Sequence, residues 1–193
     1  MRPTDVYTIP SGLPVPADDG ACAHLPGKRV PPVPLPSTAG GPVDLSRIAG
    51  RVVVYAYPRT GEPEQPPLVE EWDLIPGARG CTPQTCGFRD HHRDLTALGV
   101  AAVFGLSTQD TAYQRELAQR LHLPFPVLSD AALALTTSLN LPTMTVANMI
   151  LLKRLALVID DGTIVKAFYP VFPPDRNAAD VVAWLREHPA TID

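Results

Sequence analysis

Apolar residues along this chain gather in short runs that alternate with amphipathic segments. The run at 51–57 is rich in β-branched and aromatic residues, and Pro58 follows it, which predicts a buried strand. A second run, at 101–106, predicts another strand. Amphipathic stretches at about 82–98 and 110–121 predict helices on either side of that second strand. This alternation is typical of an α/β fold with parallel strands.

The remainder of the chain predicts smaller elements. Residues 125–129 lead into a short helix that begins near Asp130, and a loop is expected around Pro142. Two strands at 155–159 and 163–169 are joined through an Asp-Gly step, which is a strong hairpin signal. A final helix is expected over about 176–186.

Proline interrupts the pattern in two places. Residues 1–42 hold many of the 23 prolines and show neither helical nor strand period, so we expect an N-terminal extension that leads into the domain and lies outside its core. Residues 61–79 predict a long loop inserted after the first core strand. With 193 residues, the chain is then one domain over 43–193, preceded by the extension.

Charge and hydropathy exclude several kinds of partner. The net charge of −4 provides no broad basic field, so neither nucleic acid nor an anionic membrane surface is an expected partner. No run approaches the ~20 apolar residues of a membrane span, and the first residues lack the pattern of a signal peptide. These features favour a cytoplasmic protein with small-molecule or protein partners.

The three cysteines carry the candidate chemistry. Their number is too small and odd for a secreted disulfide scaffold, and the close pair Cys81 and Cys86 indicates metal or redox chemistry instead. Cys81 falls at a predicted helix start, where backbone amides favour a thiolate, so it is a candidate nucleophile. His91 and His92 follow, but the spacing CxxxxCxxxxHH departs from that of zinc sites, and no metal ligand is predicted. Cys22 is expected to be incidental.

Several short motifs, taken in order, resemble those of a known family. They are Tyr57-Pro58, Gly80-Cys81-Thr82 with Cys86 five residues after Cys81, Phe88-Arg89-Asp90, Gly105-Leu106-Ser107 and Leu123-Pro124-Phe125-Pro126-Val127-Leu128-Ser129-Asp130. Over about 31–187 the chain resembles the peroxiredoxins, and most closely their bacterioferritin-comigratory-protein (PrxQ) subfamily. The resemblance implies a thioredoxin-like α/β fold, with helices flanking a central mixed sheet. It also implies a thiol-dependent peroxidase that needs no cofactor.

The resemblance assigns roles to individual residues. Cys81 would attack hydrogen peroxide or an organic hydroperoxide and become a sulfenic acid, and Cys86 would then condense with it to a disulfide. Arg154 matches the family's arginine, which stabilises the thiolate and polarises the leaving oxygen. A thioredoxin-type dithiol would reduce the disulfide. The subfamily suggests a monomer or a weak homodimer.

Helix geometry constrains the disulfide. Residues five positions apart on a regular helix have side chains about 140° apart and Cα atoms roughly 8 to 9 Å apart. The usual limit for a disulfide is about 7 Å between Cα atoms. We therefore predict that residues 80–90 unfold locally in each catalytic cycle.

The chain departs from the family pattern in front of the cysteine. The family has a threonine three residues before it, where this chain has Ala78, and Pro58 stands 23 positions before Cys81 instead of seven. Thr60 would supply the hydroxyl if the intervening loop folds back, so Pro58 and Thr60 are the predicted substrate-binding residues. The loop has enough apolar surface to cover the site or to pack on its own domain.

Two alternatives to the peroxidase stay open from the sequence. One is a redox-sensing or disulfide-exchange protein with weak peroxidase activity, because the missing threonine lowers the expected reactivity toward peroxide. The other is a non-enzymatic binding domain on the same fold. Low reactivity of Cys81 would be the sign of the second alternative.

Overall fold

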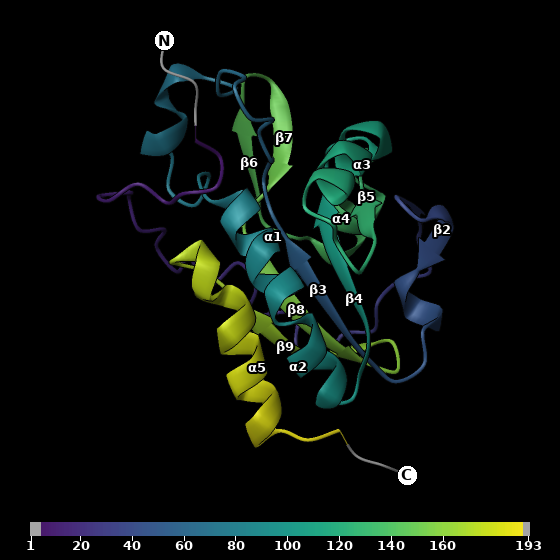
Figure 1. The fold of residues 1–193 in the computed structure, drawn as a ribbon. Coiled ribbons are helices and arrows are strands. Elements are labelled where there is room, and N and C mark those ends of the chain that lie inside the picture. Colours follow the sequence, from purple (N-terminus) through teal and green to yellow (C-terminus); the bar gives the residue numbers. More distant parts are fainter. Residues whose placement is uncertain (1–4, 191–193) are drawn as a thin grey trace.

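A computed structural model describes residues 5–190 (Figure 1). Its centre is a seven-stranded mixed sheet with the order β2-β1-β5-β4-β3-β8-β9, and β6 and β7 form a separate two-stranded sheet. The strands are β1 (Pro34–Ser37), β2 (Gly40–Asp44), β3 (Arg51–Ala56), β4 (Val100–Ser107), β5 (Val127–Ser129), β6 (Thr143–Val146), β7 (Met149–Leu152), β8 (Leu155–Asp160) and β9 (Thr163–Phe168). β3, β4 and β5 are parallel, whereas β8 and β1 join them antiparallel. The predicted α/β fold with a central mixed sheet is confirmed.

Helices cover both faces of this sheet. They are α1 (Cys81–Asp90), α2 (His92–Ala97), α3 (Thr111–Arg120), α4 (Ala134–Leu139) and α5 (Asn177–Glu187), with the 3₁₀ turns η1 (Leu45–Arg47), η2 (Glu70–Leu74) and η3 (Pro174–Arg176). In Figure 1, α1, α2 and α5 lie along one face of β3 and β8, and the packing of α1 against α5 agrees with that view. No helix of residues 5–190 is both long enough and apolar enough to cross a membrane.

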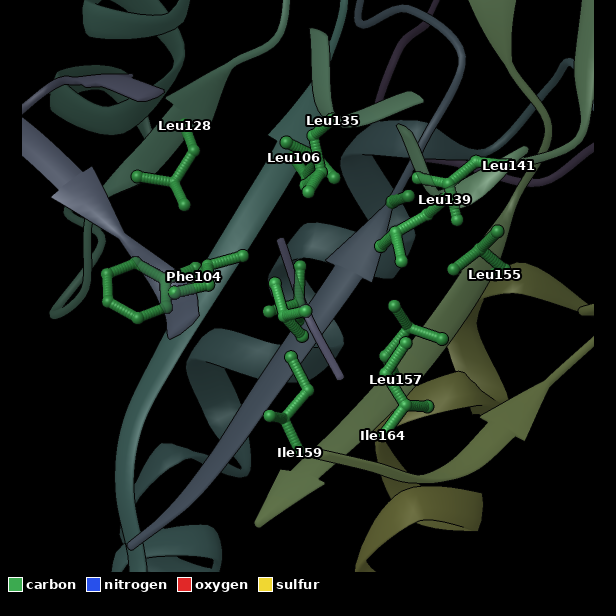
Figure 2. Packing of buried hydrophobic residues seen from close by; sticks show 14 of the residues in the cluster. Phe104, Leu106, Leu128, Leu135, Leu139, Leu141, Leu155, Leu157, Ile159 and Ile164 are labelled. Atoms are coloured by element: carbon green, nitrogen blue, oxygen red, sulfur yellow. The ribbon is translucent and has the colours of Figure 1, made fainter. Parts of the chain in front are cut away.

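The central strand β3 is buried on both faces because its side chains alternate between two apolar clusters. Val52 and Val54 belong to a cluster that includes α4, whereas Val53 and Tyr55 belong to the cluster under α1, α2, α3 and α5. Figure 2 shows residues of the first cluster, with side chains from β4, β5, α4, β8 and β9 pointing toward one another. Burial on both faces fixes the position of β3 in the centre of the sheet. The strand ends at Ala56, and Pro58 follows shortly after it.

The N-terminal extension contributes to the core, and the expectation that it lies outside is wrong. Leu25, Val30 and Leu35 are buried in the first cluster together with Cys22. β1 lies within the Pro-rich run, where its outward positions are Pro34 and Pro36 and its inward positions are Leu35 and Ser37. The strand period is therefore present, but prolines mask it.

Two further differences concern local elements. The single helix predicted over 82–98 is divided into α1 and α2 at His91. The loop expected around Pro142 is followed at once by the β6–β7 hairpin, whose turn places Ala147 and Asn148 at φ values of 48° and 62°. This turn lacks the Asn-Gly or Asp-Gly step that announces most such hairpins. The other predicted hairpin, β8–β9, is confirmed, with Asp161 and Gly162 at positive φ.

Candidate active site

Cys81 is the first residue of α1, at the position that the sequence predicts. Gly80 caps the helix with a φ of 100°, and a Cβ atom built there would lie 2.3 Å from Cγ of Pro174. Only glycine therefore allows this backbone to pass so close to η3. Pro83 lies in the first turn, where its missing N–H removes no helical hydrogen bond. The Cys81 side chain is only 3% exposed.

Arg154, which lies between β7 and β8, points its guanidinium at this helix start. Its Nη2 atom lies 3.2 Å from Sγ of Cys81 and donates to the carbonyl oxygens of Gly77, Ala78 and Arg79 at 3.0 to 3.2 Å. Among residues 5–190, no carboxylate oxygen lies within 4.0 Å of the Arg154 guanidinium. Its positive charge is thus available to a negatively charged sulfur, and burial strengthens that attraction.

Gln84 holds Arg154 in place, and no sequence motif marks it. Its Oε1 accepts a hydrogen bond from Nη1 of Arg154, while its Nε2 donates to Oδ1 of Asn177 at 2.9 Å. Gln84 is fully buried on α1, one turn after Cys81. A buried amide is retained at such a place only if its hydrogen bonds are satisfied, so the amide fixes the guanidinium against the cysteine.

Thr60 and Pro58 occupy different places relative to the cysteine. Thr60 is buried and lines the same cavity as Cys81, and its Oγ1 donates to Oε1 of Gln109 at 3.1 Å. Its carbonyl oxygen accepts a hydrogen bond from the hydroxyl of Tyr113 at 3.1 Å. Pro58 is also buried, but it is not among the residues that line the cavity. The loop after β3 does fold back on the site.

A cavity of about 420 Å³ opens over Cys81. One wall comes from the loop at 61–79, whose apolar lining residues are Pro66, Pro67, Leu68 and Trp72. Trp72 also packs against Val146 and Leu151 of the β6–β7 hairpin. The sequence left open whether the inserted loop covers the site or packs on its own domain. In the structure it does both.

Cys86 lies on α1 but opens on a different hollow. This hollow is lined by Tyr7, Thr8, Ile9, Pro83, Gly87, Asp90, His91 and Asp175. α1 is continuous from Cys81 to Asp90, and both cysteines are free thiols. With one thiol on each side of the helix, a disulfide between them requires the first turns of α1 to unwind.

Burial raises the pKa of Cys86 above its ordinary value of 9.0, and the nearby charge of Arg89 offsets only part of this rise. Because the thiolate is the reactive form, a raised pKa means less thiolate at a given pH. We expect the rate of Cys86 alkylation in a Cys81→Ser variant to go on rising above pH 9.0. Mass analysis over about pH 7 to 10 measures this. A rate that levels off at or below pH 9.0 would contradict the expectation.

None of the remaining candidate ligands lines the cavity over Cys81. Cys22 is buried in the core, and desolvation raises its pKa to about 12. Nδ1 of His91 lies 3.1 Å from Asp94, and His92 packs on the ring of Phe125. Within residues 5–190 there is no group of three or more His, Cys, Asp or Glu side chains that could hold a metal ion.

Comparison with known proteins identifies the family. A family model described as Redoxin matches residues 25–183. The chain belongs to the Redoxin family. Peroxiredoxin Q from the chloroplast of Sedum lineare is 29% identical to this Redoxin protein over 162 residues, or 83% of this chain and 77% of the relative. The family and this likeness confirm that the chain is a peroxiredoxin, a thiol-dependent peroxidase similar to the Q type.

Solved structures agree with this assignment. Peroxidoxin BcpB from Mycobacterium tuberculosis matches the Redoxin chain with a TM-score of 0.67 and 25% identity, covering 86% of this chain and 99% of BcpB. A PrxQ variant from Xylella fastidiosa matches with a TM-score of 0.68 over 86% of this chain and 98% of the variant, at 20% identity. These likenesses confirm the thioredoxin-like peroxiredoxin fold.

Proposed function

We propose that Cys81 is the attacking cysteine and that Arg154 assists it. The observation that carries this assignment is the 3.2 Å contact between Nη2 of Arg154 and Sγ of Cys81, at a helix N-terminus. The thiolate attacks the terminal oxygen of the hydroperoxide, the O–O bond breaks, and the leaving oxygen takes a proton to become water or an alcohol. The guanidinium stabilises the charge that moves from sulfur to the leaving oxygen.

Cys86 completes the proposed cycle as the resolving cysteine. Its thiol attacks the sulfenic sulfur of Cys81, a disulfide forms, and the sulfenic oxygen leaves as water. A dithiol of the thioredoxin type then reduces the disulfide and becomes oxidised itself. We propose a monomer or weak homodimer in the cytoplasm, where thiols are kept reduced.

The cavity supports organic hydroperoxides as substrates besides hydrogen peroxide. At about 420 Å³ it has room for far more than one molecule of hydrogen peroxide, which is little larger than water. Its apolar wall of Pro66, Pro67, Leu68 and Trp72 suits a hydrocarbon group. The polar residues Thr60 and Tyr113 lie in the same cavity and suit the peroxide end.

Removing the Trp72 wall should change this selectivity. We expect Trp72→Ala to lower the ratio of kcat/KM for cumene hydroperoxide to that for hydrogen peroxide by about tenfold, because the apolar wall of the cavity loses its largest side chain. Leu74→Ala is the matched control, since Leu74 lies on the same 3₁₀ turn and is 72% exposed. An unchanged ratio in Trp72→Ala would show that the loop does not select the substrate.

A steady-state assay tests the proposed assignment. Dithiothreitol serves as the reductant, and the consumption of hydroperoxide is followed for the native protein and for Cys81→Ser and Cys22→Ser. We expect Cys81→Ser to lose the activity and Cys22→Ser to keep it, since Cys22 is buried away from the site. Activity that survives in Cys81→Ser would refute the assignment. Slow oxidation combined with ready disulfide exchange would favour the redox-sensing alternative instead.

A further inference from the structure

Residues 5–9, which we call the N-terminal clasp, are tied to the turn that carries Cys81. Nη2 of Arg79 donates hydrogen bonds to the carbonyl oxygens of Asp5 and Thr8, the second at 3.3 Å. The Asp5 carboxylate accepts hydrogen bonds from the backbone N–H of Tyr7 and from the hydroxyl of Thr8, both at 2.9 Å. The clasp is therefore a hydrogen-bonded turn, fixed to a residue two positions before the cysteine.

A second attachment holds the clasp to α3. The Arg120 guanidinium lies 5.6 Å from the centre of the Tyr7 ring, and its Nη1 donates to the Tyr7 hydroxyl at 3.2 Å. Arg120 is itself held by an ion pair with Glu116 at 2.6 Å and by the carbonyl oxygen of Gly61. The clasp thus spans from Arg79, in front of α1, to the last residue of α3.

Between these attachments the clasp borders both thiols. Val6 lines the cavity over Cys81, whereas Tyr7, Thr8 and Ile9 line the hollow that holds Cys86. The same hollow includes residues of the helical turns that must unwind before Cys81 and Cys86 can meet. Arg79 stands directly in front of α1, so unwinding the first turn of α1 also strains the hydrogen bonds between Arg79 and the clasp.

We propose that the N-terminal clasp holds α1 folded and so delays formation of the Cys81–Cys86 disulfide. This inference rests on the proposed function. A delayed disulfide prolongs the life of the Cys81 sulfenic acid, and two reactions then compete for it. Attack by Cys86 gives the disulfide and water, whereas attack on a second hydroperoxide breaks its O–O bond and gives a sulfinic acid and an alcohol or water. The clasp sets the ratio of these products.

Single-turnover oxidation of Tyr7→Ala tests the clasp, because Tyr7 lines the hollow that holds Cys86 and does not line the cavity over Cys81. We expect oxidation of Cys81 to keep its rate, while the disulfide forms about two- to five-fold faster, the factor that corresponds to losing a surface cation–π contact. The yield of sulfinic acid at high peroxide should fall correspondingly. Tyr7→Phe keeps the ring over Arg120 and should remain close to the native protein. Val15→Ala, a change at a residue that is 66% exposed in the same extension, is the matched control.

Alkylation tests the clasp independently of peroxide chemistry. In a Cys81→Ser background, maleimide labelling of Cys86 should be about two- to five-fold faster with Tyr7→Ala than without it, because the hollow is opened. If neither the labelling rate of Cys86 nor the rate of disulfide formation changes, the proposed role of the clasp is overturned. A different result would separate the two proposals. If Tyr7→Ala speeds the labelling of Cys86, but Cys81 of the native protein reacts with peroxide no faster than a free thiol, the peroxidase assignment is refuted and the shielding of Cys86 by the clasp stands.

Discussion

Arg154→Ala is expected to slow the oxidation of Cys81 by hydrogen peroxide by about 10²- to 10³-fold, the usual cost of removing one group that stabilises transition-state charge. The native guanidinium lies against Sγ of Cys81 and is only 3% exposed, so water cannot replace it efficiently. Stopped-flow measurement of the first oxidation step gives the rate constant directly.

Two variants control for the loss of a buried arginine. Arg154→Lys keeps the charge but cannot reproduce the bonds to Gln84 and to three carbonyl oxygens, so it should recover only part of the rate. Arg51→Ala removes another buried arginine, which pairs with Asp160 at the far end of β3, and it should lower the melting temperature without slowing oxidation. If Arg154→Ala is folded and oxidises at the native rate, Arg154 has no catalytic role.

Cys86→Ser is expected to abolish the intramolecular disulfide and to leave Cys81 as a sulfenic acid after one equivalent of hydroperoxide. No other cysteine can replace Cys86, because Cys22 is buried in the opposite apolar cluster and its pKa is raised to about 12. Further hydroperoxide should then convert Cys81 to the sulfinic acid. Dimedone trapping followed by mass analysis distinguishes these products.

Cys22→Ser is the matched control for that experiment, and it should form the disulfide as the native protein does. A disulfide between Cys81 and Cys22 in the Cys86→Ser variant would show that the core opens far more widely than unwinding of the first turns of α1 requires. A disulfide between two copies of the chain would instead show that resolution occurs across a dimer.

The central fold could be predicted because its signals are local. The run at 52–57 is apolar throughout, since β3 is buried on both faces, and the Asp-Gly step marks the β8–β9 turn. β1 could not be predicted because prolines occupy its outward positions, and proline normally argues against a strand. The β6–β7 turn uses Ala147 and Asn148, which carry no strong turn signal as a pair.

The candidate site was predictable only where a motif marks it. Cys81 and Cys86 stand at a recognisable helix start, and Arg154 stands in front of a recognisable hairpin. Gln84, by contrast, bonds to Arg154, 70 positions away, and nothing in the spacing of two polar residues shows that they meet. The same holds for the clasp, because the partner of Tyr7 is 113 positions distant.

Stopped-flow oxidation of the reduced native protein by hydrogen peroxide, followed by peptide mass analysis, tests whether Cys81 and Cys86 together carry the peroxidase cycle. We predict oxidation much faster than that of a free cysteine, and a Cys81–Cys86 disulfide as the product of one equivalent. Oxidation at the rate of a free thiol, or a product without that disulfide, would contradict the proposed cycle.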